Sequence, residues 1–477
     1  MSFRSNALAM LTGTVFAQAI PLILSPVLAR LYSPDAFGLQ TLVMGITTIC
    51  VVPATLRLDL AMVLSPDDGE AKDIAAVILA VTMLMVAVFC LIALGWGEDI
   101  ASALGHPGDA FWIWILPLLT ISVVLFQVLS AFASRTKRFR PIATGNVINQ
   151  VSYILSALAL GAIASGWTLG LSISKLIGQA AGTIGLLREH GRDLFSILRH
   201  FDLSKMLRAT RRYWQFLVFN TPYSLIGSLS REAPILIFSA TGAVSAAGLY
   251  GMARTIVLAP TLLISNALSQ VFYREAVALK GTVRLHDMTV TLIRTGLLVT
   301  AAPFAFCAAW GGDFFSVVFG ATWREAGVFA MVLAPAAWVS TQTGWPERLF
   351  EVNGRQGVSF TVQIIADTFM IAALAAVLVS TSSPFWGVVA YAVSNAIYQF
   401  AYLISIFRIS QFPLRKLTAT IIWSILVFAL FYLVFMALKA VSGASLVSGI
   451  SAIVIAAVAA LVIAWNCRKD VVAFTEI

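Results

Sequence analysis

Hydrophobic and polar positions follow one another in long blocks along the chain. Fourteen blocks are almost free of Asp, Glu, Lys and Arg, and short polar segments separate them. Because a helix needs about 20 mostly apolar residues to cross a hydrocarbon layer of roughly 30 Å, each block is long enough to span a membrane. The pattern predicts an all-α polytopic membrane protein with about fourteen transmembrane helices. Their expected extents are 7–29, 37–57, 74–96, 111–133, 141–164, 167–187, 214–240, 246–273, 288–310, 326–345, 357–380, 385–407, 416–438 and 444–466.

Composition supports this prediction. Of the 477 residues, 60% are hydrophobic and 11% are charged, against roughly 45–50% and about 25% in ordinary soluble domains. Such an excess of apolar residues is too large for a surface that faces water. The chain is therefore expected to be embedded in a bilayer.

The positive charges show which side of the membrane each connection faces. If the amino terminus is cytoplasmic, 24 of the 31 Lys and Arg residues fall in cytoplasmic segments, 3 on the opposite side and 4 inside spans. Cytoplasmic loops carry the excess of Lys and Arg in membrane proteins. We therefore expect both termini to be cytoplasmic. The formal net charge of +9 then reflects membrane topology, and no nucleic-acid partner is expected.

The longest connection divides the chain. Residues 188–213 carry seven cations, and Phe195, Leu198 and Phe201 share one helical face. This favours an amphipathic helix on the cytoplasmic leaflet; a plain solvated linker is the alternative. The expected domains are a six-helix bundle (1–187), the amphipathic linker (188–213), a second six-helix bundle (214–407), and two additional helices with a cytoplasmic tail (408–477).

Two halves of six spans each would enter the membrane in the same orientation. They would then be related by an axis along the membrane normal, rather than by an inverted repeat. Weak internal similarity supports this relation, since Phe37-Gly38-Leu39 opens the second span and Ala247-Gly248-Leu249-Tyr250 opens the eighth.

Sequence motifs of catalysis are absent. There is no GxxxxGK[ST], HExxH or GxSxG motif, all four histidines lie in connections, and the four cysteines have no CxxC spacing. We expect no catalytic residue, no metal site and no cofactor. Coupling of the chain's activity to H⁺ or Na⁺ is left open.

Polar residues inside the spans are the candidates for function, because burying an ionisable group in a membrane costs several kcal/mol. Lys175, Arg231 and Arg254 fall at similar depth in the outer half of the membrane. Three cations at one depth indicate an anionic ligand. Asn220 continues the polar face of Arg231, and Gln18 belongs to a polar stripe in the first span.

A purely structural interpretation of these charges is also open. The cations would then only pair with Glu232, Asp367 or the carbonyl groups at helix ends. Asp367, in the eleventh span, is expected to be a counter-charge in a shared cavity, although a proton or sodium site is the alternative.

Several blocks of the sequence resemble a known family. They are LTGTVFAQAIPLILSPVLARLYSPDAFGLQTLV (11–43), ATLRLDLAMVLSPDD (54–68), GLYGMARTIVLAPTLLISNALSQVFYREA (248–276) and FGATWREAG (319–327). They are similar to the Wzx-type oligosaccharide flippases of the polysaccharide biosynthesis family, within the multidrug/oligosaccharidyl-lipid/polysaccharide exporter superfamily. The resemblance covers the first twelve helices.

The resemblance implies two six-helix bundles around a central cationic cavity, working by alternating access. The implied substrate is an undecaprenyl-diphosphate-linked oligosaccharide repeat unit, moved outward across the bacterial inner membrane. Arg254 falls where relatives place a basic residue, while Arg57 and Asp59 lie in the LRxxLA segment as a substrate-binding candidate and a counter-charge. Implied partners are membrane lipids, the polyprenyl-diphosphate-linked glycan, and a polysaccharide polymerase with its chain-length regulator.

Three other functions are alternatives to this one. A cation-coupled multidrug exporter of the same superfamily would favour buried carboxylates over buried cations. A lipid II flippase fits the count of fourteen helices, but its motifs are not evident. A membrane polysaccharide polymerase or ligase needs a large extracytoplasmic loop, and no loop on that side is long enough.

Overall fold

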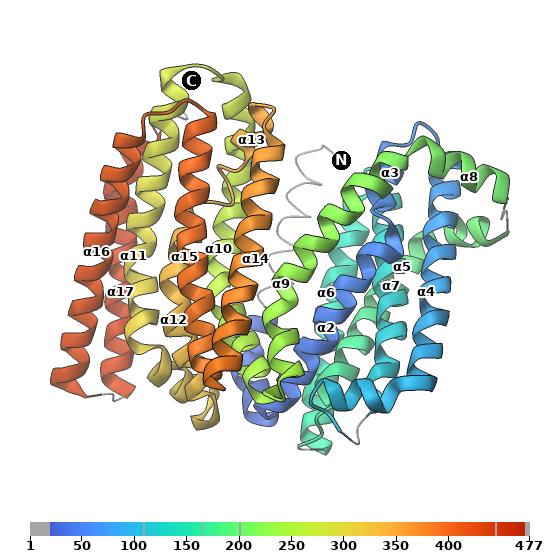
Figure 1. Cartoon of the computed structure of the whole chain (residues 1–477), viewed down its shortest axis with the longest axis horizontal. Helices are drawn as coiled ribbons and strands as arrows, with labels where there is room; N and C mark the ends of the chain where they lie inside the picture. The colour runs from blue at the N-terminus through green and yellow to red at the C-terminus, as the bar shows by residue number, and fades with distance from the viewer. Residues whose placement is uncertain (1–19, 108–109, 165, 200–201, 444–445, 473–477) are drawn as a thin grey trace. The chain divides into compact units, whose positions relative to one another are not determined.

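The computed structural model describes residues 20–107, 110–164, 166–199, 202–443 and 446–472. Within these ranges all regular elements are helices, and most run the length of a membrane span (Figure 1). A short apolar helix, Ile20–Leu31, comes first. The others are α2 (Pro34–Thr55), α3 (Leu58–Leu64), α4 (Asp68–Ala103), α5 (Ile115–Arg135), α6 (Phe139–Ile163), α7 (Gly170–Arg199), α8 (Leu203–Arg212), α9 (Thr221–Ala240), α10 (Val244–Ala278), α11 (Val283–Phe319), α12 (Arg324–Ser340), α13 (Arg348–Val352), α14 (Gln356–Thr381), α15 (Pro384–Ile409), α16 (Leu414–Ser442) and α17 (Leu446–Val472).

The predicted fold class is confirmed: the chain is an all-α, multi-pass membrane protein. Ten of the described helices are long and apolar enough to cross a membrane. Every one of the fourteen predicted spans overlaps a helix, but the number that cross the bilayer stays a prediction. Several boundaries differ by a turn or more; α12, for example, ends at Ser340 and not near 345. The polar sequence Thr341-Gln342-Thr343 forms turns there instead of a further helical turn.

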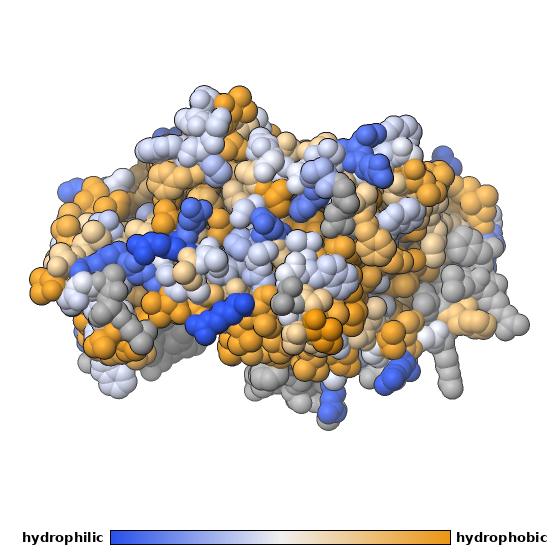
Figure 2. Space-filling model, turned by 90° about the horizontal axis from the view of Figure 1, so that it is seen from below, coloured by the Kyte–Doolittle hydropathy of each residue, from blue (hydrophilic) through white to orange (hydrophobic). Residues whose placement is uncertain are grey.

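Much of the surface is hydrophobic, as a lipid-facing surface must be. Figure 2, which looks at the molecule from below Figure 1, shows apolar residues mixed with hydrophilic ones at the helix ends. Large side chains such as Leu94 (73% exposed), Ile163 (84%) and Val379 (74%) would be costly in water. Lipid chains around the helices remove that cost.

Contacts divide the chain into two compact units, Met1–Gly248 and Leu249–Ile477. These units differ from the predicted bundles at α9, because the second predicted bundle (214–407) includes α9. In the structure α9 packs against α2 and belongs to the first unit. The arrangement as two six-helix bundles related by an axis stays a prediction.

The core of the first unit joins five helices. Small and branched residues of α2, α3, α4 and α5 form a buried cluster that includes Ala54, Met62, Ile78 and Val128, and Met206 of α8 packs into it. This cluster fixes the ends of α3, α4 and α5 relative to one another.

The last two helices, α16 and α17, form part of the core of the second unit. α16 and α17 both pack along α11, where Trp310 and Ala305 of α11 meet Phe435 of α16 and Ala456 of α17 in a buried cluster. The indole nitrogen of Trp310 donates a hydrogen bond of 3.1 Å to the Phe435 carbonyl oxygen. The C-terminal pair is therefore an integral part of this unit.

The 188–213 connection consists of two helical pieces. Its first part continues α7 to Arg199, and α8 begins after Asp202. Phe195 is 63% exposed; the side chain of Leu198 and all of Phe201 lie outside the described residues. The large apolar side chains of α8 are instead Leu203, Met206 and Leu207.

Candidate functional site: charged residues within the helices

Lys175 is a half-buried cation on α7. Its ammonium nitrogen lies 4.9 Å from the centre of the Tyr153 ring on α6, a distance at which the negative face of the ring attracts a cation. The Tyr153 hydroxyl accepts a hydrogen bond of 2.9 Å from the Gln40 side chain on α2. Among the described residues no carboxylate forms an ion pair with Lys175. The amine is therefore held by an aromatic ring and not by a described carboxylate.

Two glycines of α7 bring this site together. A Cβ atom at Gly178 would lie 2.6 Å from the Asn149 carbonyl oxygen, and one at Gly182 would lie 2.8 Å from the Gly145 carbonyl oxygen. Only glycine allows α7 and α6 to approach so closely. Between the two helices, the Asn149 amide donates a hydrogen bond of 2.7 Å to Gln179. The Gly178-x-x-x-Gly182 spacing is visible in the sequence. Tyr153 and Gln40 were not predicted, because their only signal is a polar atom on an apolar helix.

Arg231 and Glu232 are neighbours on α9 that point in different directions. Glu232 faces α2, because a Cβ atom at Gly45 would lie 3.4 Å from its side chain. Arg231 is exposed, and its guanidinium lies 3.4 Å from the buried Ser228 hydroxyl. Asn220 is half-buried and ends a π-helical turn, Phe216–Asn220, that precedes α9.

Positions along the axis of α2 show the relative depths of Lys175, Glu232 and Arg57. Gln40 and Gly45 are five residues apart, or about 7–8 Å along the helix axis, so Lys175 and Glu232 lie at similar levels. Thr55, the last residue of α2, is about 22 Å from Gln40 along the same axis. Arg57 therefore lies at the opposite end of α2 from Lys175, and the two cations do not form one cluster.

Arg57 occupies a sharp break between α2 and α3. Leu56 and Arg57 both have left-handed backbone angles, with φ of 52° and 53°, although each such residue costs about 1–2 kcal/mol. The Arg57 Nε atom and one carboxylate oxygen of Asp59 are buried with no hydrogen-bond partner among the described residues. Strain and unsatisfied charged groups at one position are typical of functional segments.

The remaining predicted residues are placed as follows. Arg254 on α10 and Asp367 on α14 are both half-buried and both belong to the second unit. Gln18 lies outside the described residues.

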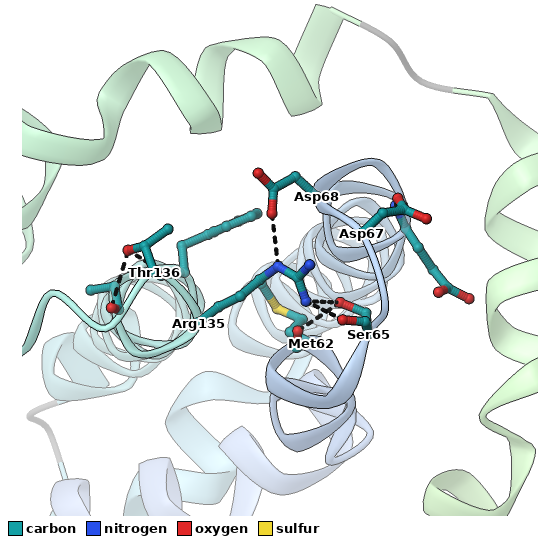
Figure 3. A network of polar contacts seen from close by, with 9 residues as sticks. Met62, Ser65, Asp67, Asp68, Arg135 and Thr136 are labelled. Carbon is teal, nitrogen blue, oxygen red and sulfur yellow. Dashed lines mark hydrogen bonds and ion pairs between the residues drawn. The ribbon is translucent and has the colours of Figure 1, made fainter.

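A polar network that sequence reasoning missed joins the predicted cytoplasmic ends of α3, α4 and α5 (Figure 3). The Arg135 guanidinium donates to Asp68 at 2.8 Å, to the Ser65 hydroxyl at 2.8 Å and to the Ser65 carbonyl oxygen. The planar fork of arginine serves three acceptors at once. Near this network, Arg212 of α8 pairs with Glu70 of α4 at 3.1 Å.

The second unit has a comparable charged cluster at its predicted periplasmic end. Asp313 of α11 is 9% exposed and pairs with Arg324 of α12 at 3.1 Å and with Lys439 of α16 at 2.5 Å. Arg324 and Lys439 are two of the three cations assigned to the periplasmic side. Their charge is compensated locally, so they do not oppose the predicted orientation.

The described residues contain no group of three or more His, Cys, Asp or Glu side chains that could hold a metal ion. The charged and polar side chains described above offer electrostatic chemistry inside the helices.

Residues 27–328, more than half of the chain, match the family described as polysaccharide biosynthesis proteins. The chain belongs to this family. The family-level resemblance inferred from the sequence is therefore confirmed.

A curated relative also matches. The succinoglycan biosynthesis transport protein ExoT of Rhizobium meliloti (strain 1021) is 23% identical over 327 residues, which are 66% of this chain and 61% of the relative. The aligned region thus spans less than two thirds of that protein's length.

Two solved structures share the fold. The lipid II flippase MurJ, in an inward closed conformation, has a TM-score of 0.72 at 12% identity, over 98% of this chain and 100% of that one. A multidrug transporter of the MATE family in the MOP superfamily, inward-facing, has a TM-score of 0.64 at 14% identity, over 83% and 95%. The matched proteins are named as transport proteins, which agrees with the prediction that the chain is not an enzyme.

Proposed function

We propose that this protein is a flippase for polyprenyl-diphosphate-linked oligosaccharide repeat units, moving them from the cytoplasmic to the periplasmic leaflet of the bacterial inner membrane. The observation that carries the proposal is the match of residues 27–328 to polysaccharide biosynthesis proteins on a fold shared with a lipid II flippase. The proposed substrate carries a sugar and a charged diphosphate linkage, and a membrane-spanning protein must bind both.

The cations supply the binding chemistry in this proposal. A diphosphate that leaves water for a low-dielectric cavity needs fixed positive charge in place of its hydration. Lys175 has an ammonium group without a described carboxylate partner, and Arg254 contributes a fork that matches phosphate geometry. Arg231, Asn220, Arg57 and Gln18 are further substrate-binding candidates.

Carboxylates balance these cations between transport cycles. Asp367, Glu232 and Asp59 are proposed as counter-charges. Coupling to H⁺ or Na⁺ through Asp367 is the competing role.

The membrane potential favours outward movement of such a substrate. About two negative charges leaving a negative interior gain roughly 4–5 kcal/mol per 100 mV, from about 2.3 kcal/mol per charge. Transport can then proceed without ATP, provided that no co-bound cation cancels the moved charge.

The proposed setting follows from this function. Both termini are cytoplasmic, and membrane lipids surround the helices. A periplasmic polysaccharide polymerase and its chain-length regulator receive the product.

Deletion of the gene with complementation tests the proposal. We expect loss of a surface polysaccharide, accumulation of its lipid-linked precursor on the cytoplasmic leaflet, and restoration of both by the intact gene. Rescue of cells depleted of their lipid II flippase would instead identify lipid II as the substrate. Unchanged surface glycan with raised drug sensitivity would identify an exporter and overturn the proposal.

A further inference from the structure

The helix α8 presents three distinct faces. At about 100° per residue, Met206 and Ala209 share one face, Leu203 and Leu207 a second, and Arg208 and Arg211 a third. No acidic residue occurs within α8. A soluble linker would have no need for separate apolar and cationic faces on one short helix.

One face holds α8 in place on the protein. Met206 and Ala209 are buried in the cluster shared by α3, α4 and α5, and Arg212 pairs with Glu70 on α4. Asp202 caps the start of α8 by accepting hydrogen bonds from the backbone nitrogens of Ser204 and Lys205. Figure 1 shows α8 lying across the end of α4 rather than along it, so α8 runs along the membrane plane if α4 crosses the bilayer.

The other two faces are uncovered. Leu203 is 69% exposed and Leu207 is 62% exposed, and both are adjacent to the exposed cations Arg208 and Arg211. No ion pair to either arginine occurs among the described residues. An apolar stripe beside a row of cations complements the acyl chains and anionic headgroups of a lipid leaflet.

We propose that α8 is a binding surface for anionic phospholipids, with Leu203 and Leu207 inserted among acyl chains and Arg208 and Arg211 on headgroup phosphates. The proposal concerns the lipid around the protein and is independent of the substrate that the protein moves. Through Met206 and the pair of Arg212 with Glu70, lipid held at α8 also supports the cytoplasmic ends of α3, α4 and α5.

Fluorescence quenching in nanodiscs tests this directly. A bimane label is placed at Leu207→Cys after replacement of Cys50, Cys90, Cys307 and Cys467, and the discs contain brominated phosphatidylglycerol or brominated phosphatidylcholine. We expect quenching by both lipids and a clear preference for phosphatidylglycerol. R208Q/R211Q should lower that preference by up to about 30-fold, since each cation near the surface contributes about 1 kcal/mol.

A matched control distinguishes lipid binding at the α8 surface from a general effect of losing two positive charges. Lys137 and Arg138 are exposed cations of the α5–α6 connection, and K137Q/R138Q removes the same charge away from the apolar stripe. This control should leave the preference unchanged. Absence of quenching by either lipid, or equal quenching by both in the protein with Arg208 and Arg211 intact, would overturn the proposal.

Discussion

Gly38 near the start of α2 and Gly248 near the start of α10 are in backbone contact. A Cβ atom on Gly248 would lie 2.7 Å from the amide nitrogen of Gly38, and one on Gly38 would lie 3.2 Å from the amide nitrogen of Gly248. These are the glycines of Phe37-Gly38-Leu39 and Ala247-Gly248-Leu249, the two similar segments seen in the sequence. The two glycines therefore meet at one point of the first unit.

Adding a methyl group at this contact should destabilise the protein. Gly248→Ala forces two helix backbones apart, and overpacking of this kind costs about 1–3 kcal/mol. Gly95 on α4 is a matched control, because a Cβ atom there would meet nothing within 4 Å. Gly95→Ala should be neutral or stabilising by up to about 1 kcal/mol. Thermal unfolding in detergent measures both variants, and equal melting temperatures would contradict the close contact.

The Arg135 network predicts that replacing Arg135 and replacing Asp68 will have unequal effects on stability. Asp68 has a side chain that is 76% exposed, so its ion pair with Arg135 is screened by solvent and contributes at most about 1 kcal/mol. The bonds from Arg135 to Ser65 are less exposed, and a hydrogen bond from a charged group contributes about 1.5–3 kcal/mol. Arg135→Ala should therefore lower the melting temperature clearly more than Asp68→Asn. A larger effect of Asp68→Asn would show that the ion pair dominates.

The cap of α8 should respond to acid. The Ser204 hydroxyl donates to Asp202, and this bond with the backbone bonds of Ser204 and Lys205 lowers the pKa of Asp202 below its usual value of 3.8. A lowered pKa in the folded state means that stabilisation is present above pH 3.8 and is lost as pH falls through the folded-state pKa. A spin label at Leu207→Cys should become more mobile in that acidic range. With Asp202→Asn this acid-induced change should disappear; its persistence would assign it to another group.

The orientation can be tested with reporter fusions. Fusions after Arg140 and Arg212 should be cytoplasmic, and fusions near Gly105 and Ser382 should be periplasmic, because most cations lie on the side of the first pair. A reversed result at two of these sites would contradict the orientation.

The helices were predictable from sequence because bilayer thickness sets their length and lipid requires continuous apolar residues. The same rule says nothing about what lies beyond the hydrocarbon. α4 begins at Asp68, outside the predicted 74–96, since polar turns can continue a helix into water. At Trp96, where the predicted span ends, the backbone leaves helical geometry (φ −135°, ψ 16°), and the turns beyond this kink run on to Ala103. The placement of α9 beside α2 was likewise not predictable, because the hydrophobic pattern does not say which helices pack together.

The candidate site was only partly predictable. Lys175 and Arg231 stand out because charge is costly in a membrane. Tyr153 and Gln40 are ordinary residues for a span, and only the close approach of α6 and α7 gives them a role beside Lys175. The network of Arg135 joins residues 70 positions apart in the sequence, which no local pattern reveals.

Transport by the purified protein tests the central claim most directly. Proteoliposomes carry a fluorescent polyprenyl-diphosphate oligosaccharide, and its movement between leaflets is followed by quenching from outside. We expect transport by the natural protein, a fall of at least about tenfold in rate for K175A/R254A, partial retention for R254K, and no change for K137Q/R138Q. The tenfold loss corresponds to about 1.4 kcal/mol, less than the loss of even one charged hydrogen bond. An undiminished rate in K175A/R254A, at equal incorporation of protein, would show that these cations are structural and that the account of substrate binding is wrong.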